Sequence, residues 1–405
     1  MSDSGLNSEK LRVDFQKLYD DSVHLLHGLT TPDGILASTV EADNYKRIWA
    51  RDSIICGLAG LMIKDTVLIE GLKNSLLTLA KTQHELGMIP SNVLPTNHSD
   101  VSFGSLAGRV DAHTWFIVGC CNYYLETQDT ESWMQLKPAV EKCRTLLKIS
   151  EFNDKGWIYT PLSGNWADEY PVHGYTLYDN MLRLWGESLW GKITGETFSH
   201  FDQIKNRTNI NFWPTSAASE EDIYHNDVFK QLDVSRIEHF MAFLLPGVYD
   251  QRFDAAGNAL ALLQYELSKG QKQQLSNYIS KLSSELTKPL IPAFWPIITP
   301  ESADWNLLKG NFSFNFKNHP GAFHNGGVWP VWMGLFCLGL SQNGMYSEVK
   351  KIIESFTQTV LENNDWDFQE YFDAQSLKVG GKTQMGYTAS GIVFMHMALK
   401  SNSVF

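Results

Sequence analysis

The stretch FHNGGVWPVW, residues 323–332, places His324, Asn325 and two glycines directly before an apolar run. A buried helix needs no imidazole or amide at its start, so these side chains favour a pocket that binds a polar ligand. The apolar run continues as a helical pattern over about residues 328–342, and the same 3.6-residue period recurs along the whole chain. We expect further helices at about 8–27, 51–63, 66–85, 110–127, 130–149, 175–193, 198–206, 255–267, 271–287, 345–363 and 384–400, and a short one near 234–245.

Polar clusters mark the start of every second expected helix, at intervals of about one helix–loop–helix–loop unit. Six inner helices with converging N-termini, returned by six outer helices, would form an (α/α)6 barrel, an all-α fold with long loops at one mouth. No linker interrupts the chain, so we expect a single domain over residues 1–405. Helix capping is the alternative explanation for one or two of the clusters. The clusters are Arg51 with Asp52, Asp111, Asp168, Asp254 with Asn258, His324 with Asn325, and Gln384.

Composition restricts the class of ligand. The net charge of −12 argues against nucleic acid or an anionic membrane as the main partner. The 13 Trp, 15 Tyr and 22 Phe residues exceed what a core requires. Any one of them is more often a core residue, but as a set they fit a pocket that stacks aromatic faces on sugar rings. We therefore expect a small carbohydrate as the substrate.

Cysteine usage and segment hydropathy bear on metals and location. The five cysteines include no CxxC pair and no Cys/His ligand spacing, so we expect buried thiols, no metal and no cofactor. The N-terminus shows no basic region followed by an apolar stretch, and no apolar run reaches the roughly 18–20 residues that span a bilayer. These features predict a cytoplasmic protein without a membrane partner. They leave a homo-oligomer open.

Two carboxyl groups lie among aromatic residues in separate loops. In GNWADEYPVHGYTLYDN, residues 164–180, Asp168 lies near Trp166, whose ring should partly desolvate the carboxyl group and raise its pKa. Glu169 is a second candidate for the general acid. The alternative without a catalytic role is that Asp168 caps the next helix. In WDFQEYFDAQSLKVGGKTQMGYTASG, residues 366–391, the second carboxyl group is Glu370, with Asp365, Asp367 and Asp373 as nearby rivals. Glycoside hydrolysis needs two carboxyl groups on opposite faces of a sugar ring, and this pair could supply them.

Two helix starts carry further candidates for sugar contacts. RIWARDS, residues 47–53, combines Trp49 with Arg51 and Asp52. GRVDAHTWFI, residues 108–117, adds Asp111 and Trp115. Donors and acceptors that alternate in this way suit sugar hydroxyl groups. An ion pair that ties one helix to its neighbour is the structural alternative.

The sequence resembles the six-hairpin glycoside hydrolases, and most closely the neutral/alkaline invertase family. The resemblance is carried in order by YKRIWARDSI (45–54), GMIPSNV (87–93), VDAHTWFI (110–117), NWADEY…GYTLYDNML (165–182), RFDAAGNALALL (252–263), FHNGGVWPVW (323–332) and the segment 368–391. It implies that Asp168 is the general acid and Glu370 the general base of an inverting reaction. It also implies substrate contacts from Trp49, Arg51, Asp52, Asp111, Trp115, Trp166, His324, Asn325, Trp329 and Gln384.

The resemblance leaves the substrate open. Invertases have a basic pair after the acid, whereas Glu169-Tyr170-Pro171 follow Asp168 here. Glycosidase chemistry on a small α-linked glycoside such as sucrose is the leading expectation, and a debranching-type or oligosaccharide α-glucosidase is the alternative. A sugar epimerase on the same fold would need catalytic histidines, for which His113, His173, His239 and His324 are scattered candidates. A protein that only binds sugars would not need the two carboxyl groups.

Overall fold

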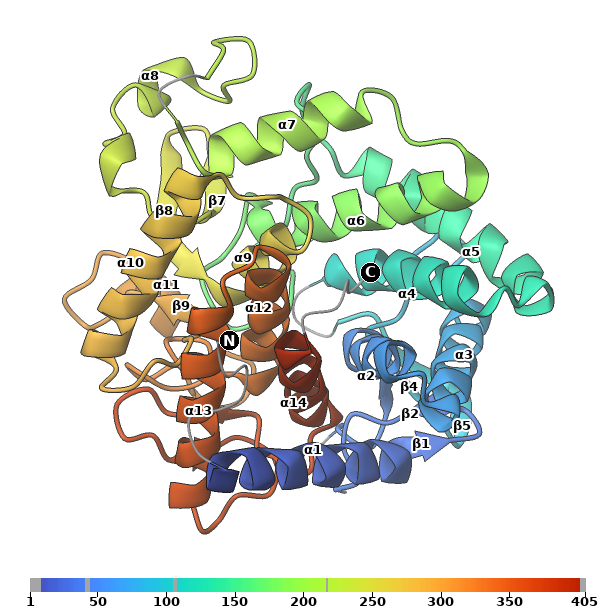
Figure 1. The fold of residues 1–405 in the computed structure, drawn as a ribbon. Helices are drawn as coiled ribbons and strands as arrows, with labels where there is room; N and C mark the ends of the chain where they lie inside the picture. Colours follow the sequence, from blue (N-terminus) through green and yellow to red (C-terminus); the bar gives the residue numbers. More distant parts are fainter. Residues whose placement is uncertain (1–8, 41–43, 105–107, 216–217, 401–405) are drawn as a thin grey trace.

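The ring of helices predicted from the polar clusters is the frame of the molecule (Figure 1). The computed structural model describes residues 9–40, 44–104, 108–215 and 218–400. Within these ranges, six inner helices each pack against the next, and the last packs against the first, which closes the ring. They are α2 (Ala50–Ile63), α4 (Asp111–Thr127), α6 (Leu177–Thr194), α9 (Ala255–Leu262), α12 (Pro330–Gln342) and α14 (Gly386–Leu399). The expected (α/α)6 barrel is confirmed.

The outer helices alternate with the inner ones along the chain and lie outside the ring (Figure 1). All the long helices expected from the period are confirmed, with ends that shift by a few residues. The outer helices within the described ranges are α1 (Glu9–Leu29), α3 (Thr66–Lys81), α5 (Thr130–Ile149), α7 (Phe201–Phe212), α10 (Lys269–Glu285) and α13 (Tyr346–Glu362). The short helices α8 (Asn226–Phe229) and α11 (Trp305–Lys309) were not foreseen.

Close packing explains why the inner helices are apolar on all sides. In α12, every residue from Pro330 to Ser341 is buried, as expected for a helix with neighbours all round. Glycine is required where α12 meets α14. A Cβ atom on Gly334 would lie 2.2 Å from the carbonyl oxygen of Gly391, and one on Gly391 would lie 2.2 Å from that of Pro330. Any larger side chain would force these two backbones apart.

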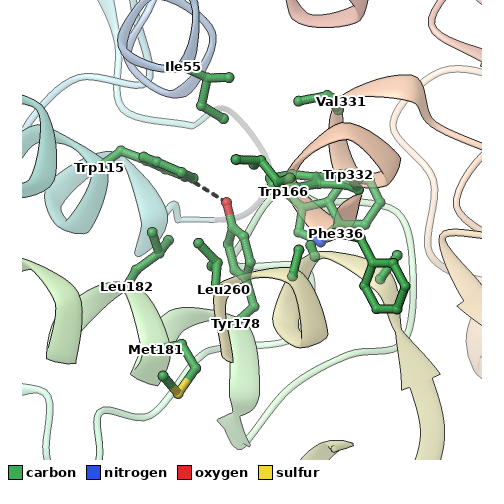
Figure 2. Close-up of a cluster of buried hydrophobic side chains, with 14 of the residues drawn as sticks. Ile55, Trp115, Trp166, Tyr178, Met181, Leu182, Leu260, Val331, Trp332 and Phe336 are labelled. Atoms are coloured by element: carbon green, nitrogen blue, oxygen red, sulfur yellow. Dashed lines mark hydrogen bonds between the residues drawn. The ribbon is translucent and has the colours of Figure 1, made fainter. Parts of the chain in front are cut away.

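The interior of the ring is filled by large side chains (Figure 2). Trp115 from α4, Tyr178 from α6 and Trp332 from α12 are all buried there. The indole nitrogen of Trp115 donates a hydrogen bond of 2.7 Å to the Tyr178 hydroxyl group. The barrel is therefore a packed core, and open space lies at one end of it.

Short antiparallel strands adjoin the N-terminal ends of the inner helices. Strand β3 (Ile48–Trp49) runs into α2, and it pairs with β4 (Asn92–Leu94), which pairs with β5 (Asn97–Ser102). A second sheet has the order β6 (Tyr175–Thr176), β7 (Met241–Leu245), β8 (Val248–Asp254) and β9 (Phe294–Trp295), with β6 leading into α6 and β8 into α9. Smaller pairs are β1 (Thr30–Thr31) with β2 (Gly34–Ile35), and β10 (Tyr371–Phe372) with β11 (Val379–Gly380).

The prediction of a short helix near residues 234–245 is wrong. This segment begins with a single 3-10 turn, Val234–Arg236, and continues as the buried strand β7, which pairs with β8. Residues 241–245 read MAFLL, and an apolar run of this length fits a buried strand as well as a helix. The sheet around β7 decides the conformation.

The structure also tests whether the polar clusters are only helix caps. Asp254 is a cap, because its carboxylate accepts a hydrogen bond from the Ala256 backbone N–H at 3.0 Å. The inner helices α2, α4, α12 and α14 have no side-chain cap. Capping therefore accounts for Asp254 and leaves the clusters at Arg51, Asp111, His324 and Gln384 to another cause.

Two buried carboxyl groups near the inner helix starts should make stability depend on pH. Burial raises the pKa of Asp254 to about 7, and the buried Asp179 carboxylate adds to the shift. One Asp254 oxygen has no hydrogen-bond partner within the described residues. In the unfolded chain the pKa of Asp is about 4, so folding favours the protonated form. Stability is retained below pH 4 and is lost as the pH rises toward 7.

We therefore expect Asp254→Asn to stabilise the protein at pH 8, on the order of 2–4 kcal/mol, and to change little at pH 4.5. Asparagine keeps the cap and removes the buried charge. Urea unfolding at both pH values measures the effect, and Asp154→Asn at an exposed turn is the control. Equal stability of Asp254→Asn and the parent protein at pH 8 would contradict the account.

Candidate active site

One cavity of about 740 Å³ opens where the N-terminal ends of the inner helices meet. Its wall combines residues that are far apart in the sequence. Arg51 and Asp52 come from α2, Asp168 from the loop before α6, and Glu370 from the loop before α14. A cavity of this size accommodates a small ligand.

Most of the site residues predicted from the sequence line this cavity. Trp166, His324 and Trp329 form an aromatic wall in which the His324 and Trp329 rings stack at 5.5 Å and Trp166 meets both edge-on. The predicted residues that line the cavity are Trp49, Arg51, Asp52, Trp166, Asp168, His324, Trp329 and Glu370.

Asp111 and Trp115 lie behind the cavity wall rather than facing a sugar ring. The Asp111 carboxylate pairs with the Arg51 guanidinium at 2.7 Å and borders a small recess of about 10 Å³ beside it. It also accepts a hydrogen bond from Tyr178 at 3.3 Å. Trp115 is fully buried and donates to Tyr178, so the predicted sugar contact at Trp115 is corrected to a core position. A chain of hydrogen bonds thus runs from the core to Arg51.

Asn325 and Gln384 also have structural partners outside the cavity wall. The Asn325 amide accepts from the Ile298 N–H at 2.8 Å and donates to the carbonyl oxygens of Ile298 and Asn318 at 2.8 and 3.1 Å. The predicted sugar contact at Asn325 is therefore corrected to a tie between two loops. The Gln384 side chain accepts a hydrogen bond from Thr39, which joins two segments 345 residues apart.

Several polar atoms at the cavity are buried without a hydrogen-bond partner among the described residues. They are Arg51 Nε, Trp166 Nε1, His324 Nδ1 and the Tyr387 hydroxyl oxygen. Buried polar groups are almost always hydrogen-bonded, so several such atoms on residues that line one cavity indicate a place where a ligand supplies the partners. Burial also lowers the pKa of His324 to about 3, which leaves its imidazole neutral at pH 7.

Glu370 is held from two sides. Its Oε1 accepts a hydrogen bond of 2.8 Å from the Tyr45 hydroxyl group, and its Oε2 accepts one of 3.0 Å from the Lys382 backbone N–H. A Cβ atom on Gly381 would lie 2.3 Å from Oε2, so the turn after β11 needs glycine for this approach. Burial raises the pKa of Glu370, although both donors oppose the shift.

Asp168 has the opposite electrostatic environment. Its Oδ2 accepts a charge-assisted hydrogen bond of 2.5 Å from Arg109 Nη2. Burial acts to raise the pKa of Asp168, but the positive charges of Arg109 and Arg51 outweigh it, so the pKa is lowered. The expectation that aromatic neighbours raise this pKa is wrong, because Arg109 was not considered as a partner.

Glu169, the rival carboxyl group, also lines the cavity and is buried. Its Oε1 accepts a hydrogen bond from the Ser313 N–H at 3.1 Å, and its Oε2 has no partner among the described residues. Burial raises the pKa of Glu169, and the charge of Lys317 opposes the shift. Its backbone carbonyl accepts from the Asn318 amide at 2.7 Å, so Glu169 also anchors the loop around residues 311–318.

The histidines do not assemble into a site. Among the lining residues in the described part of the chain, His324 is the one histidine. His113 and His239 are buried elsewhere, hydrogen-bonded to the backbone groups of Ile89 and Phe240. No group of three or more His, Cys, Asp or Glu side chains gathers to hold a metal ion within the described ranges. In the same ranges, no helix combines the length and the apolar character that crossing a bilayer requires.

Reasoning from the sequence missed five lining residues that carry a charge or a phenol group. Tyr45, Arg109 and Lys382 lie inside the quoted motifs, and each donates a hydrogen bond to one of the two carboxyl groups. Tyr387 follows Gln384 in the last motif. Lys317 lies in the segment NFSFNFK, residues 311–317, whose alternating aromatic residues were a signal that could have been examined.

Comparison with known families and curated proteins identifies relatives of this chain. Residues 197–401 match the family model of alkaline and neutral invertases, which includes Glu370 and His324 but not Asp168. The mitochondrial alkaline/neutral invertase C of Arabidopsis thaliana is 26% identical over 150 residues, which are 37% of this chain and 21% of that protein. Cytosolic invertase 1 of Oryza sativa subsp. japonica is 25% identical over 144 residues, 35% and 24% of the two chains. The match thus spans less than a quarter of each relative.

Solved structures share the fold over nearly the whole chain. A family GH63 mannosylglycerate hydrolase from Thermus thermophilus, in complex with glucose, has a TM-score of 0.63 at 13% identity and covers 93% of this chain and 99% of its own. A wild-type glycosidase has a TM-score of 0.63 at 11% identity and covers 98% and 100% of the two chains. At these identities the likeness shows the fold alone.

Proposed function

Because this chain belongs to the alkaline and neutral invertase family, we propose that it is an inverting exo-glycosidase that hydrolyses a small α-linked glycoside such as sucrose. The single observation that carries the proposal is that Asp168 and Glu370 line one cavity, together with buried hydrogen-bonding atoms that have no partner among the described residues. A pocket that only bound a sugar would have no use for two carboxyl groups held so differently.

In the proposed reaction, Asp168 donates a proton to the glycosidic oxygen as the bond between that oxygen and the anomeric carbon breaks. Glu370 accepts a proton from a water molecule whose oxygen forms the new bond to the anomeric carbon. Asp168 ends ionised and Glu370 ends protonated, and exchange with solvent restores both. The rigid hold on Glu370 by Tyr45 keeps its carboxylate in place for this step.

The sugar ring whose anomeric carbon is attacked would lie against the aromatic wall formed by Trp166, His324 and Trp329. We propose that His324 and Trp166 supply donors to its hydroxyl groups and that Trp329 stacks on its face. The Arg51 guanidinium would bind two neighbouring hydroxyl groups of the sugar. The ion pair with Asp111 would fix the orientation of that guanidinium. Asp52, whose pKa burial raises to about 6 despite Arg51, would add an acceptor.

An oligosaccharide α-glucosidase is the second candidate. The side chain of Phe314 lines the cavity and is 85% exposed, so its ring could stack on a sugar beyond the one that is cleaved. Hydrolysis of sucrose, maltose, isomaltose, trehalose and a maltooligosaccharide series, compared by kcat/KM, separates the two candidates. A rise of kcat/KM with chain length would favour the second.

We also propose a cytoplasmic enzyme that needs no metal and has neither nucleic acid nor membrane as partner, as the composition predicts. The relatives carry mitochondrial and cytosolic names, so their names do not decide the location. Whether the chain forms a homo-oligomer is a matter for sedimentation analysis.

Substitution of the two carboxyl groups should separate their roles. Asp168→Asn should reduce hydrolysis of substrates with poor leaving groups by about a hundredfold or more and spare a glycosyl fluoride, whose leaving group needs no proton. Glu370→Gln should suppress both reactions by a similar factor, because water must be activated in each case. Steady-state kinetics with circular dichroism as the folding control measures this. A fully active, folded Glu370→Gln variant would remove Glu370 as the base.

Tyr45→Phe should change the pH dependence on the acidic side. The Tyr45 hydroxyl group stabilises ionised Glu370, so its loss should raise the pKa of Glu370 further. The base must be ionised, hence activity should begin to fall at a higher pH than in the parent enzyme. We expect roughly a tenfold loss of kcat/KM on the acidic limb, from the value of a hydrogen bond to a charged group. The exposed Tyr346→Phe is the control, and an unmoved acidic limb would contradict the assignment.

A further inference from the structure

The ion pair between Arg109 and Asp168 presents a difficulty for the proposed acid. A general acid must carry a proton before it can donate one, whereas the Arg109 guanidinium at 2.5 Å favours the ionised carboxylate. Arg109 also donates to the Ser163 carbonyl oxygen at 3.2 Å, which fixes its position beside the cavity. The ion pair is accessible from the cavity, because the Asp168 side chain is 32% exposed and both residues line the cavity wall. A ligand can therefore reach Arg109.

A second cation lines the same cavity. Lys317 is exposed and makes no ion pair within the described ranges, and its Nζ lies 4.9 Å from the centre of the Phe323 ring, which also lines the cavity. Its charge opposes the raised pKa of both Glu169 and Glu370. The loop that carries Lys317 is fixed to Glu169 through Ser313 and Asn318, directly next to Asp168.

We propose that the leaving group of the substrate carries an anion, a carboxylate or a phosphate, which Arg109 and Lys317 bind together. The anion then takes the place of Asp168 as the partner of Arg109. Guanidinium groups bind both kinds of anion in a bidentate manner, and a lysine adds a point charge. This inference rests on the proposed function and names its substrate class.

Binding of the anion would prepare the acid. Once Arg109 is neutralised by the ligand, Asp168 loses its main positive neighbour and gains a negative one, so it takes up a proton from solvent. The other charged or titratable groups around Asp168 are Arg51, which favours ionisation, the neutral His324, and Glu169, Asp52 and Tyr45. None of these is displaced by the ligand, so the change at Arg109 decides the protonation state.

Glycosides that share one sugar and differ only in a three-carbon leaving group test the proposal. Glycerol is the neutral leaving group, glycerate carries a carboxylate, and glycerol phosphate carries a phosphate. We expect one or both charged glycosides to exceed the glycerol glycoside at least tenfold in kcat/KM, and the better of the two identifies the anion. Arg109→Gln and Lys317→Met should each remove most of that advantage, so that the kcat/KM values of the charged glycosides fall toward that of the glycerol glycoside. Lys309→Met, an exposed lysine outside the cavity wall, is the matched control.

Proton uptake provides a readout that does not depend on turnover. Calorimetric titration of the parent protein with free glycerate and glycerol phosphate, in two buffers that differ in ionisation enthalpy, should show net proton uptake with the preferred anion, and Arg109→Gln should abolish it. Glycerol should show no uptake. Equal kcat/KM for all three glycosides, equal losses in both variants for charged and neutral substrates, or anion binding without proton uptake would each overturn the proposal.

The same experiments distinguish this inference from the proposed function. Hydrolysis of a glycosyl fluoride requires the base and the sugar-binding wall but not a protonated Asp168. An enzyme that hydrolyses the fluoride but shows no preference for anions would refute the anionic leaving group alone. An enzyme that hydrolyses neither the fluoride nor any glycoside would refute the proposed function.

Discussion

The ion pair between Arg109 and Asp168 is the interaction on which the chemistry of this cavity depends. It holds one carboxyl group ionised, while burial keeps the pKa of the other, Glu370, raised. An ionised Asp168 cannot donate a proton, so the ion pair with Arg109 opposes its role as the acid. In the proposal above, an anion bound at Arg109 restores the proton on Asp168. The charge on one arginine thus links the identity of the substrate to the catalytic state.

The ring of inner helices explains why such charges can lie together. Helices α12 and α14 pack closely enough to require Gly334 and Gly391. The cavity opens at the end where the helix N-termini meet. The charge of Arg51 is stabilised from the core side. A chain of hydrogen bonds runs from Trp115 through Tyr178 and Asp111 to its guanidinium group. Arg51 is thus connected to the core through these hydrogen bonds.

The sequence predicted the ring of helices better than the contacts of individual side chains. Helical period and the spacing of the polar clusters were sufficient for the ring, because five of the six inner helices span at least 13 residues and all six are largely buried. Strand β7 could not be predicted, since MAFLL fits either conformation and only pairing with β8 decides. Asn325 and Trp115 belong to the right motifs, but a sequence does not show whether an amide is already satisfied by a backbone group or an indole lies one turn below the surface. The lowered pKa of Asp168 was missed because Arg109 is 59 residues away in the chain.

The most direct test of the central claim is the configuration of the first sugar released. A water molecule activated by Glu370 on the face opposite the leaving group must invert the anomeric carbon, which requires the two carboxyl groups to stand about 6.5–9.5 Å apart. Proton NMR during the first minutes of hydrolysis of an accepted α-glycoside, before mutarotation, resolves the two anomers. The account predicts that the β-anomer appears first. Initial release of the α-anomer would show retention and would contradict the assignment of Glu370 as a base that activates water.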